Sequence, residues 1–323
     1  MSRTLKGPLP EDGQAAEISR ADIESALDRI HRHVRRTPVL APGPGAFGAR
    51  SPLTLKLELL QHTGSFKPRG AFNRILSNEV PEAGVLAASG GNHGLGVAFA
   101  ASRLGIPAEI FLPDTSPASK VQGIRALGAT VWVVPGYYSE ALAASRERAE
   151  ESGALEIHAY DMLEVLAGQG TIGLELSDQA PDLDTVLVAV GGAGLIGGIA
   201  SWYAGQTRVI GVEPERCPTL HASLAKGEPV DVEVGGVAAD ALGAARVGRH
   251  GFAAAERHVD RVILLPDEAI RAAQRRLWEE IRIVAEPGGA AALAALLSGA
   301  YEPDPDERVA VLVCGANTDP SAL

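Results

Sequence analysis

Short apolar segments that alternate with glycine turns and amphipathic segments constrain the fold of this chain most strongly. The apolar segments are predicted strands, at residues 53–57, 85–88, 108–112, 130–134, 185–190, 208–212, 262–265 and 308–313. The amphipathic segments are predicted helices, at residues 19–34, 70–76, 118–127, 139–151, 170–179, 267–280 and 288–297, and two more follow the turns at residues 89–94 and 191–198. Because strands that alternate with helices form βαβ units, the sequence predicts an α/β protein with mostly parallel sheets.

The composition excludes several classes of protein. Hydrophobic residues make up 46% and charged residues 21% of the chain, as in an ordinary soluble enzyme. The net charge of −11 argues against binding to nucleic acid or to an anionic membrane, because both attract basic surfaces. No apolar run approaches the roughly 20 residues that span a bilayer, and two cysteines make no disulfide framework. We therefore expect a cytoplasmic protein with no nucleic-acid or membrane partner.

Lysine is scarce in this chain, and one lysine stands in an unusual context. Of the 29 Lys and Arg residues, five are lysines: Lys6, Lys56, Lys67, Lys120 and Lys226. Lys67 lies between the turn-forming Gly64 and Ser65, the aromatic Phe66, and a following proline. A buried lysine can lose its proton and attack a carbonyl group, whereas arginine keeps its charge. Lys67 is therefore a candidate Schiff-base lysine; the alternative is an exposed lysine at a helix start.

A first glycine-rich turn, Ser-Gly-Gly-Asn-His-Gly, covers residues 89–94 between a predicted strand and a predicted helix. Backbone N–H groups at such a turn bind carboxylates or phosphates. Asn92 could donate a hydrogen bond to a phenolic oxygen. The alternative is a plain tight turn with a capping Ser or Asn, and His93 is more often structural than a base.

A second glycine-rich turn, at residues 190–198, follows the apolar strand at 185–190. Unpaired amides and small side chains at a helix N-terminus suit a phosphate group. The turn is ambiguous by itself, because Gly192, Gly194 and Gly197, with Glu213 further along, also match the dinucleotide-binding fingerprint. A dehydrogenase is therefore an open alternative at this point.

Cys314 follows the last predicted strand, where its thiol could meet a ring nitrogen or could be an ordinary small buried side chain. Other chemistries have little support. The sequence contains no H-x-x-x-H, H-E-x-x-H or C-x-x-C pattern of metal ligands and no G-x-S-x-G nucleophile motif.

Four motifs, at residues 61–67, 89–93, 191–195 and 314, occur in the order found in one family. Together they resemble the pyridoxal-phosphate enzymes of the tryptophan-synthase-β fold class (fold type II), most closely the serine/threonine dehydratases. The similarity runs from about residue 23 to the C-terminus. It implies that Lys67 binds pyridoxal 5′-phosphate covalently and that residues 191–195 hold the phosphate, with Ala193 in place of one glycine.

The resemblance also assigns the other site residues. It implies that Asn92 contacts the 3′-oxygen of the cofactor and that Cys314 faces the pyridine nitrogen. The implied cofactor-binding residues are Phe66, Lys67, Asn92, Gly191, Gly192, Ala193, Gly194, Leu195 and Cys314. The implied substrate-binding residues, which surround the carboxylate of an amino acid, are Ser65, Ser89, Gly90, Gly91, Asn92 and His93.

Departures from the family pattern refine these expectations. Related serine racemases carry, at the position of Gly90, a serine that protonates the opposite face of the substrate, so we expect elimination rather than racemisation. An acidic residue of metal-binding relatives is replaced here by Thr219, so we expect no metal. Anabolic threonine dehydratases carry a C-terminal regulatory domain; this chain ends at Leu323, so we expect no isoleucine-type feedback.

The resemblance implies two open, twisted, mostly parallel sheets with helices on both faces and the cofactor between two domains. Residues 1–85 and 160–323 would form the large domain, and residues 86–159 a small mobile domain that closes over the substrate. Relatives are usually dimers, so we expect a homodimer. Residues 1–20, rich in Gly, Pro and charge, are predicted to form an arm.

The expected reaction is deamination of L-threonine or L-serine by β-elimination of water, which gives 2-oxobutyrate or pyruvate and ammonia. Alternatives are a lyase for another β-hydroxy amino acid, such as 3-hydroxyaspartate, and a β-replacement enzyme. A nicotinamide-dependent dehydrogenase or a non-enzymatic binding protein is a remote alternative, because neither explains Lys67. The sequence does not choose between serine and threonine, since one methyl group is worth only about 1–3 kcal/mol of discrimination.

Overall fold

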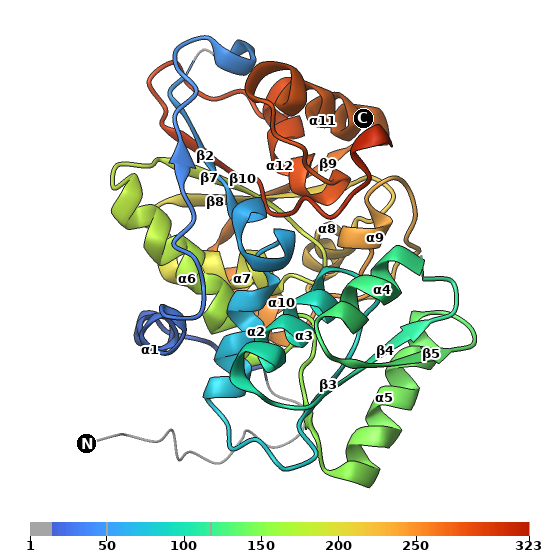
Figure 1. Ribbon diagram of the computed structural model, residues 1–323. Helices are drawn as coiled ribbons and strands as arrows, with labels where there is room; N and C mark the ends of the chain where they lie inside the picture. Colours follow the sequence, from blue (N-terminus) through green and yellow to red (C-terminus); the bar gives the residue numbers. More distant parts are fainter. Residues whose placement is uncertain (1–14, 50, 117, 323) are drawn as a thin grey trace.

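Two β-sheets organise the computed structural model, which describes residues 15–49, 51–116 and 118–322 (Figure 1). The strands are β1 Val39–Leu40, β2 Leu53–Lys56, β3 Val85–Ala88, β4 Ala108–Pro113, β5 Thr130–Val134, β6 Leu155–Glu156, β7 Thr185–Ala189, β8 Arg208–Pro214, β9 Val259–Leu265 and β10 Val309–Leu312. The larger sheet has the order β1-β2-β10-β7-β8-β9 and the smaller sheet the order β5-β4-β3-β6. Among the described strands, β1 and β2 pair antiparallel and every other pair is parallel. The predicted α/β fold with two mostly parallel sheets is confirmed.

Helices cover both sheets. They are α1 Arg20–Ile30, α2 Lys67–Leu76, α3 Asn92–Leu104, α4 Ala118–Ala126, α5 Tyr138–Ser152, α6 Leu163–Gln179, α7 Gly194–Tyr203, α8 Thr219–Lys226, α9 Ala239–Leu242, α10 Arg249–His258, α11 Asp267–Ile281 and α12 Pro287–Leu297. Helix α12 packs on β7 and β8 of the larger sheet, whereas α3 and α5 pack on β3 and β4 of the smaller one. Helix α2 contacts both α3 and α6, so it joins the helical layers of the two sheets (Figure 1).

Two helices begin earlier than the sequence predicts. Helix α2 begins at Lys67 rather than at residue 70, with a proline in its first turn, where proline is favourable. Helix α6 begins at Leu163 rather than at residue 170. A Cβ atom on Gly168 would lie 2.6 Å from the carbonyl oxygen of Arg69, so this glycine lets α6 approach α2 closely. Glycine lowers helix propensity, which hides the first turns of α6 from a sequence-based prediction.

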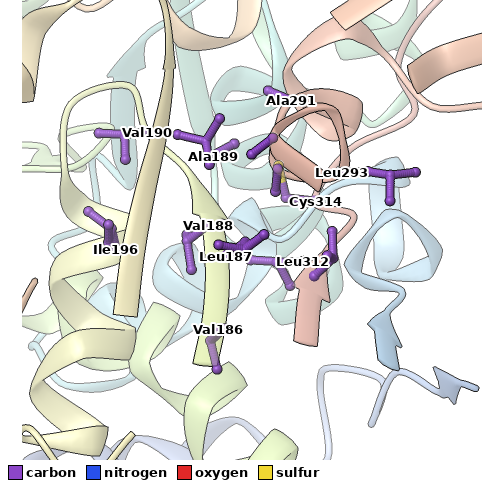
Figure 2. Close-up of a cluster of buried hydrophobic side chains, with 14 of the residues drawn as sticks. Val186, Leu187, Val188, Ala189, Val190, Ile196, Ala291, Leu293, Leu312 and Cys314 are labelled. Atoms are coloured by element: carbon purple, nitrogen blue, oxygen red, sulfur yellow. The ribbon is translucent and has the colours of Figure 1, made fainter. Parts of the chain in front are cut away.

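The core of the larger sheet surrounds β7, whose side chains are buried on both faces. Figure 2 shows Val186, Leu187 and Val188 packed in this core, with Cys314 at its edge. Central strands of parallel sheets are covered by helices on both sides, which explains the continuous apolar run at residues 185–190. The ends of β7 and β10 are thereby held rigidly, and the loops that follow them lie next to each other.

The predicted binding loops all follow strands. The glycine loop follows β7, Cys314 follows β10, and residues 89–91 follow β3. The lysine motif comes after β2 through two short 3-10 helices, Glu58–Leu60 and His62–Gly64, and an isolated bridge pairs Ser65 with Gly315. In open α/β sheets, ligands bind at the carboxyl ends of the strands, so this edge is the candidate site.

The predicted domain division stays a prediction, although the smaller sheet and its helices come from the middle of the chain, between β3 and β6. The predicted N-terminal arm falls mainly on residues 1–14, which lie outside the described residues. None of the described helices is both long and apolar enough to cross a membrane.

Candidate active site

Lys67 is the first residue of α2, and its side chain enters a cavity between the two sheets. Its amine donates a hydrogen bond to the carbonyl oxygen of Ala159 at 2.8 Å and lies 5.1 Å from the ring centroid of Phe66. Burial lowers the pKa of the Lys67 amine to about 8, because a charged ammonium group loses its hydration there. Roughly a tenth of the amine is therefore unprotonated and nucleophilic at pH 7, far more than for an ordinary lysine.

The structure brings all of the predicted cofactor-binding residues to this one cavity. They are Phe66, Lys67, Asn92, Gly191, Gly192, Ala193, Gly194, Leu195 and Cys314. They come from four separate parts of the chain, which the two sheets bring together. Their assignment to a cofactor is a proposal that the geometry supports.

The glycine loop ends at the N-terminus of α7, where the first backbone N–H groups have no acceptor within the helix. Ala193 adopts a left-handed conformation with φ of 65°, the backbone region that favours glycine. Ala193 thus keeps the backbone conformation that a glycine would adopt at this position. Exposed N–H groups and the positive end of the helix dipole make this a site for a phosphate group.

The loop at residues 89–92 provides a second helix N-terminus, at the start of α3. The Ser89 hydroxyl accepts a hydrogen bond from the backbone N–H of Gly91 at 3.1 Å, which shapes the turn. A Cβ atom on Gly90 would lie 2.5 Å from the hydroxyl oxygen of Ser116, so a neighbouring loop supplies a hydroxyl where position 90 has no side chain. This polar turn is suited to a substrate carboxylate.

Two predicted substrate-binding residues have different surroundings. The His93 ring hydrogen-bonds the carbonyl oxygen of Ile157 at 2.8 Å, and burial lowers the pKa of the His93 imidazole to about 3. His93 is thus a neutral, buried histidine that supports the turn, and its side chain is not part of the cavity lining. The Ser65 hydroxyl is buried without a hydrogen-bond partner beside Gly315, and Ser65 likewise does not line the cavity.

Cys314 follows β10 and lines the cavity. Its thiol lies 3.5 Å from the carbonyl oxygen of Gly288, within reach of a weak hydrogen bond. Burial raises the pKa of the Cys314 thiol, because the thiolate would lose its hydration. The group is therefore neutral, and it can meet a ring nitrogen without placing a negative charge beside it.

Among the residues that line the cavity, sequence reasoning assigned no role to two with polar side chains, Tyr160 and Glu286. Tyr160 lies in an irregular segment without a motif, and its hydroxyl donates to the carbonyl oxygen of Arg246 at 3.2 Å. A Cβ atom on Gly192 would lie 2.3 Å from the Tyr160 ring, so the ring packs directly against the glycine loop. Glu286 precedes α12 within a segment that the family resemblance includes, but nothing in the sequence showed that its side chain turns into the cavity.

Gly192→Ala is expected to weaken cofactor binding at least about tenfold, which corresponds to about 1.4 kcal/mol. The added methyl group would overlap the Tyr160 ring, so either the ring or the loop must move. Titration of the apoprotein with pyridoxal phosphate, followed by visible absorbance, measures the change. Gly123→Ala is the matched control, because a Cβ atom there makes only an ordinary contact, 3.4 Å from Leu95. Equal affinities of the two variants would contradict the role of the loop.

Glu213 does not act together with the glycine loop as a dinucleotide-binding residue. Its carboxylate accepts hydrogen bonds from the backbone N–H groups of Leu220 at 2.7 Å and His221 at 2.9 Å, so it caps α8. It is thus not free to bind the ribose of a dinucleotide, which removes the argument for the dehydrogenase alternative. Within the described part of the chain, no group of three or more His, Cys, Asp and Glu side chains is arranged to hold a metal ion.

A buried network of charges holds the start of α2. The Arg69 guanidinium, fully buried, pairs with Glu58 and with Glu175, each at 2.8 Å. The amine of Lys56, also fully buried, pairs with Glu175 at 2.8 Å. Two cations and two anions thus balance one another without solvent. Since Arg69 lies two residues after Lys67, this network fixes the helix turn that carries the reactive amine.

The residues of the cavity fit pyridoxal phosphate. A buried primary amine can form an imine with the aldehyde, and the N-terminus of α7 can hold the phosphate. Phe66 provides an apolar ring next to the amine, Asn92 a donor amide, and Cys314 a neutral thiol. Ser65, although next to Phe66 in the chain, is not part of the cavity lining.

Comparisons with known proteins agree with this chemistry. The family model described as pyridoxal-phosphate dependent enzyme matches residues 30–315. An L-threonine ammonia-lyase of Geobacter sulfurreducens is 40% identical over 302 residues, which cover 92% of this chain and 75% of that protein. A phenylserine dehydratase of Ralstonia pickettii is 37% identical and covers 90% of each chain. The crystal structure of a T.th. threonine deaminase superposes with a TM-score of 0.88 at 37% identity and covers 94% of this chain and 99% of that one.

Proposed function

The chain belongs to the family of pyridoxal-phosphate-dependent enzymes, and from this premise we propose that it is an ammonia-lyase for L-threonine and L-serine. The net reaction converts L-threonine to 2-oxobutyrate and ammonia, and L-serine to pyruvate and ammonia. Relatives named L-threonine ammonia-lyase and a solved threonine deaminase, at 37–40% identity over most of the chain, support this activity.

One observation carries the proposal: a buried amine and a neutral thiol share a cavity with an anion-binding helix N-terminus. The amine is Lys67, the thiol is Cys314, and the helix is α7. A nicotinamide enzyme would need neither the buried amine nor the thiol. A neutral partner at the ring nitrogen favours prompt loss of a β-substituent over long storage of negative charge on the ring.

The cofactor, Lys67 and the turn at residues 89–92 each have a defined task in this proposal. Bound pyridoxal phosphate supplies the electron sink that weakens the bonds to the substrate α-carbon. Lys67 removes the α-proton at its amine, since burial lowers the pKa of this nitrogen to about 8 and so makes its basic form accessible. The N–H groups of residues 89–92, at the start of α3, hold the substrate carboxylate and so orient the α-carbon towards Lys67.

We also propose that the smaller sheet closes over the substrate as a mobile domain. Lys120 of α4 forms an ion pair with Asp240 of α9, so the pair joins the part of the chain that carries the smaller sheet to α9. The neighbouring Ala241 and Leu242 line the cavity itself. Closure of the domain that carries the smaller sheet would exclude water from the reaction.

Two further features belong to the proposal. The resemblance to dimeric relatives supports a homodimer. The net charge of −11 and the two cysteines, which the structure leaves as free thiols, support a cytoplasmic location.

Steady-state assays over a panel of β-hydroxy amino acids test the function. We expect 2-oxo acid and ammonia from L-threonine and L-serine, with kcat/KM at least about tenfold above that for 3-phenylserine or 3-hydroxyaspartate. 3-Phenylserine is the second candidate, because a phenylserine dehydratase is 37% identical to this chain. Product formed only from 3-phenylserine would replace the proposed substrate class, and sulfide-dependent turnover of O-acetylserine would indicate β-replacement.

A further inference from the structure

Glu286 is a buried carboxyl group in the cavity whose task the reaction outlined above leaves open. It is only 4% exposed and lines the cavity beside Lys67 and Cys314. It occupies the position before α12, but its side chain makes no capping hydrogen bond to that helix. Instead, its Oε1 atom accepts a hydrogen bond from the Asn92 amide nitrogen at 2.6 Å. Across residues 15–49, 51–116 and 118–322, no salt bridge compensates this carboxyl group.

The fold makes room for the Glu286 side chain. A Cβ atom on Gly315 would lie 1.8 Å from the Glu286 Oε1 atom, so only glycine can follow Cys314 while this carboxyl group is in place. The backbone N–H of Glu286 also donates to the carbonyl oxygen of Gly315 at 3.1 Å. The carboxyl group is therefore fixed relative to the loop that carries Cys314.

The hydrogen bonds around Asn92 have a single consistent direction. The Asn317 amide nitrogen donates to the Asn92 amide oxygen at 2.6 Å and to the carbonyl oxygen of Thr63 at 2.7 Å. On its other side, Asn92 donates one N–H to Glu286. An amide nitrogen carries two N–H groups, so Asn92 keeps one donor that the chain Thr63–Asn317–Asn92–Glu286 does not use.

We propose that Glu286 is a positioning residue that holds the Asn92 amide with its second N–H directed at the phenolic oxygen of bound pyridoxal phosphate. In this cofactor the phenolic oxygen is on the ring carbon next to the one that bears the aldehyde. When Lys67 takes the aldehyde, the phenolic oxygen therefore lies close to Lys67, in the part of the cavity that Asn92 lines. If the Asn92 amide were flipped, its oxygen rather than its N–H would face the phenolic oxygen. Two hydrogen-bond acceptors would then repel each other.

The charge of Glu286 also affects the protonation of Lys67. Its carboxylate favours the cationic form of the nitrogen of Lys67, which opposes the effect of burial on that group. Burial raises the pKa of the Glu286 carboxyl to about 7, which shows how little compensation its charge receives in the cavity. The hydrogen bond from Asn92 and the positive charges of Lys120 and Lys67 offset only part of this effect of burial.

Glu286→Gln tests the proposal, with Glu213→Gln as the matched control. Both are fully or almost fully buried carboxyl groups that accept hydrogen bonds from N–H groups, but Glu213 caps α8 and does not line the cavity. An amide at position 286 can donate as well as accept, so it no longer fixes the orientation of Asn92. We expect the visible band of the cofactor-loaded, substrate-free protein to lose intensity to a near-ultraviolet band. We also expect kcat for L-threonine to fall about 10- to 100-fold with little change in KM.

The control and a double variant decide the outcome. Glu213→Gln should leave the cofactor spectrum unchanged. In a protein that already carries Asn92→Ala, Glu286→Gln should lower kcat by less than about a further threefold, because Glu286 acts through the Asn92 amide. An unchanged spectrum in Glu286→Gln, or full additivity with Asn92→Ala, would overturn the proposal. So would a spectral change that is accompanied by a lower melting temperature of the apoprotein. The inference rests on the cofactor rather than on the proposed substrate, and the substrate-free spectrum decides it even if L-threonine is not turned over.

Discussion

Lys67→Ala is expected to remove both the visible absorbance of the cofactor-loaded protein and its ammonia-lyase activity, with a loss in kcat of at least about 10³-fold. The reason is that one nitrogen has two tasks. It forms the covalent bond to the aldehyde, and it later moves the α-proton. In the structure it is the amine that lines the cavity, and burial lowers its pKa to about 8. Borohydride treatment followed by mass spectrometry measures the covalent bond directly, because reduction fixes the cofactor on the lysine.

Lys226→Ala is the control for this experiment. Lys226 is exposed at the end of α8, away from the cavity lining, so its removal should change neither the spectrum nor the rate. A Lys67→Ala protein that remains coloured, active and modified by borohydride would show that another amine carries the cofactor. The assignment of the site would then be wrong even though the family membership stands.

The local part of the site could be predicted from the sequence. Lys67, the loop at residues 89–94 and the loop at residues 191–195 are each contained in a few consecutive residues after a strand, where turn chemistry and helix N-termini create the binding groups. Such motifs depend on neighbours in the chain. Residue order alone therefore identified them, and the structure brings Lys67, Asn92 and residues 191–195 to one cavity.

The missed part of the site depends on contacts between distant residues. The hydrogen bond from Asn92 to Glu286 spans 194 positions, and the one from Asn317 to Asn92 spans 225. Tyr160 lies just before α6, and the glycine loop lies just before α7. The packing of α6 against α7 therefore brings the two together. No periodicity or propensity contains this information, since it arises from the packing of whole layers. The same reason explains the late predicted start of α6, whose glycines serve contacts with other helices.

Arg69→Met is expected to cost about 3–5 kcal/mol of the free energy of unfolding, because it leaves buried carboxylates without their cation. Arg69 is fully buried and holds both Glu58 and Glu175. Without it, Lys56 alone faces two buried carboxylates. The loss is a large fraction of the roughly 5–15 kcal/mol that stabilises a typical domain. Because Arg69 lies in the same helix turn as Lys67, the cofactor occupancy of the variant should fall as well. Denaturant titration of the apoprotein measures the stability.

Arg74→Met is the matched control on the same helix. Arg74 pairs with Glu164 at 2.8 Å, but its side chain is 17% exposed and that of Glu164 is 28% exposed. A partly exposed pair keeps some contact with water, so this variant should lose clearly less stability than Arg69→Met. Adding Glu58→Gln to Arg69→Met should restore part of the lost stability, since it removes one of the uncompensated charges. Equal losses in Arg69→Met and Arg74→Met would mean that the buried network contributes no more than a partly exposed pair, and the position of Lys67 would then depend on packing alone.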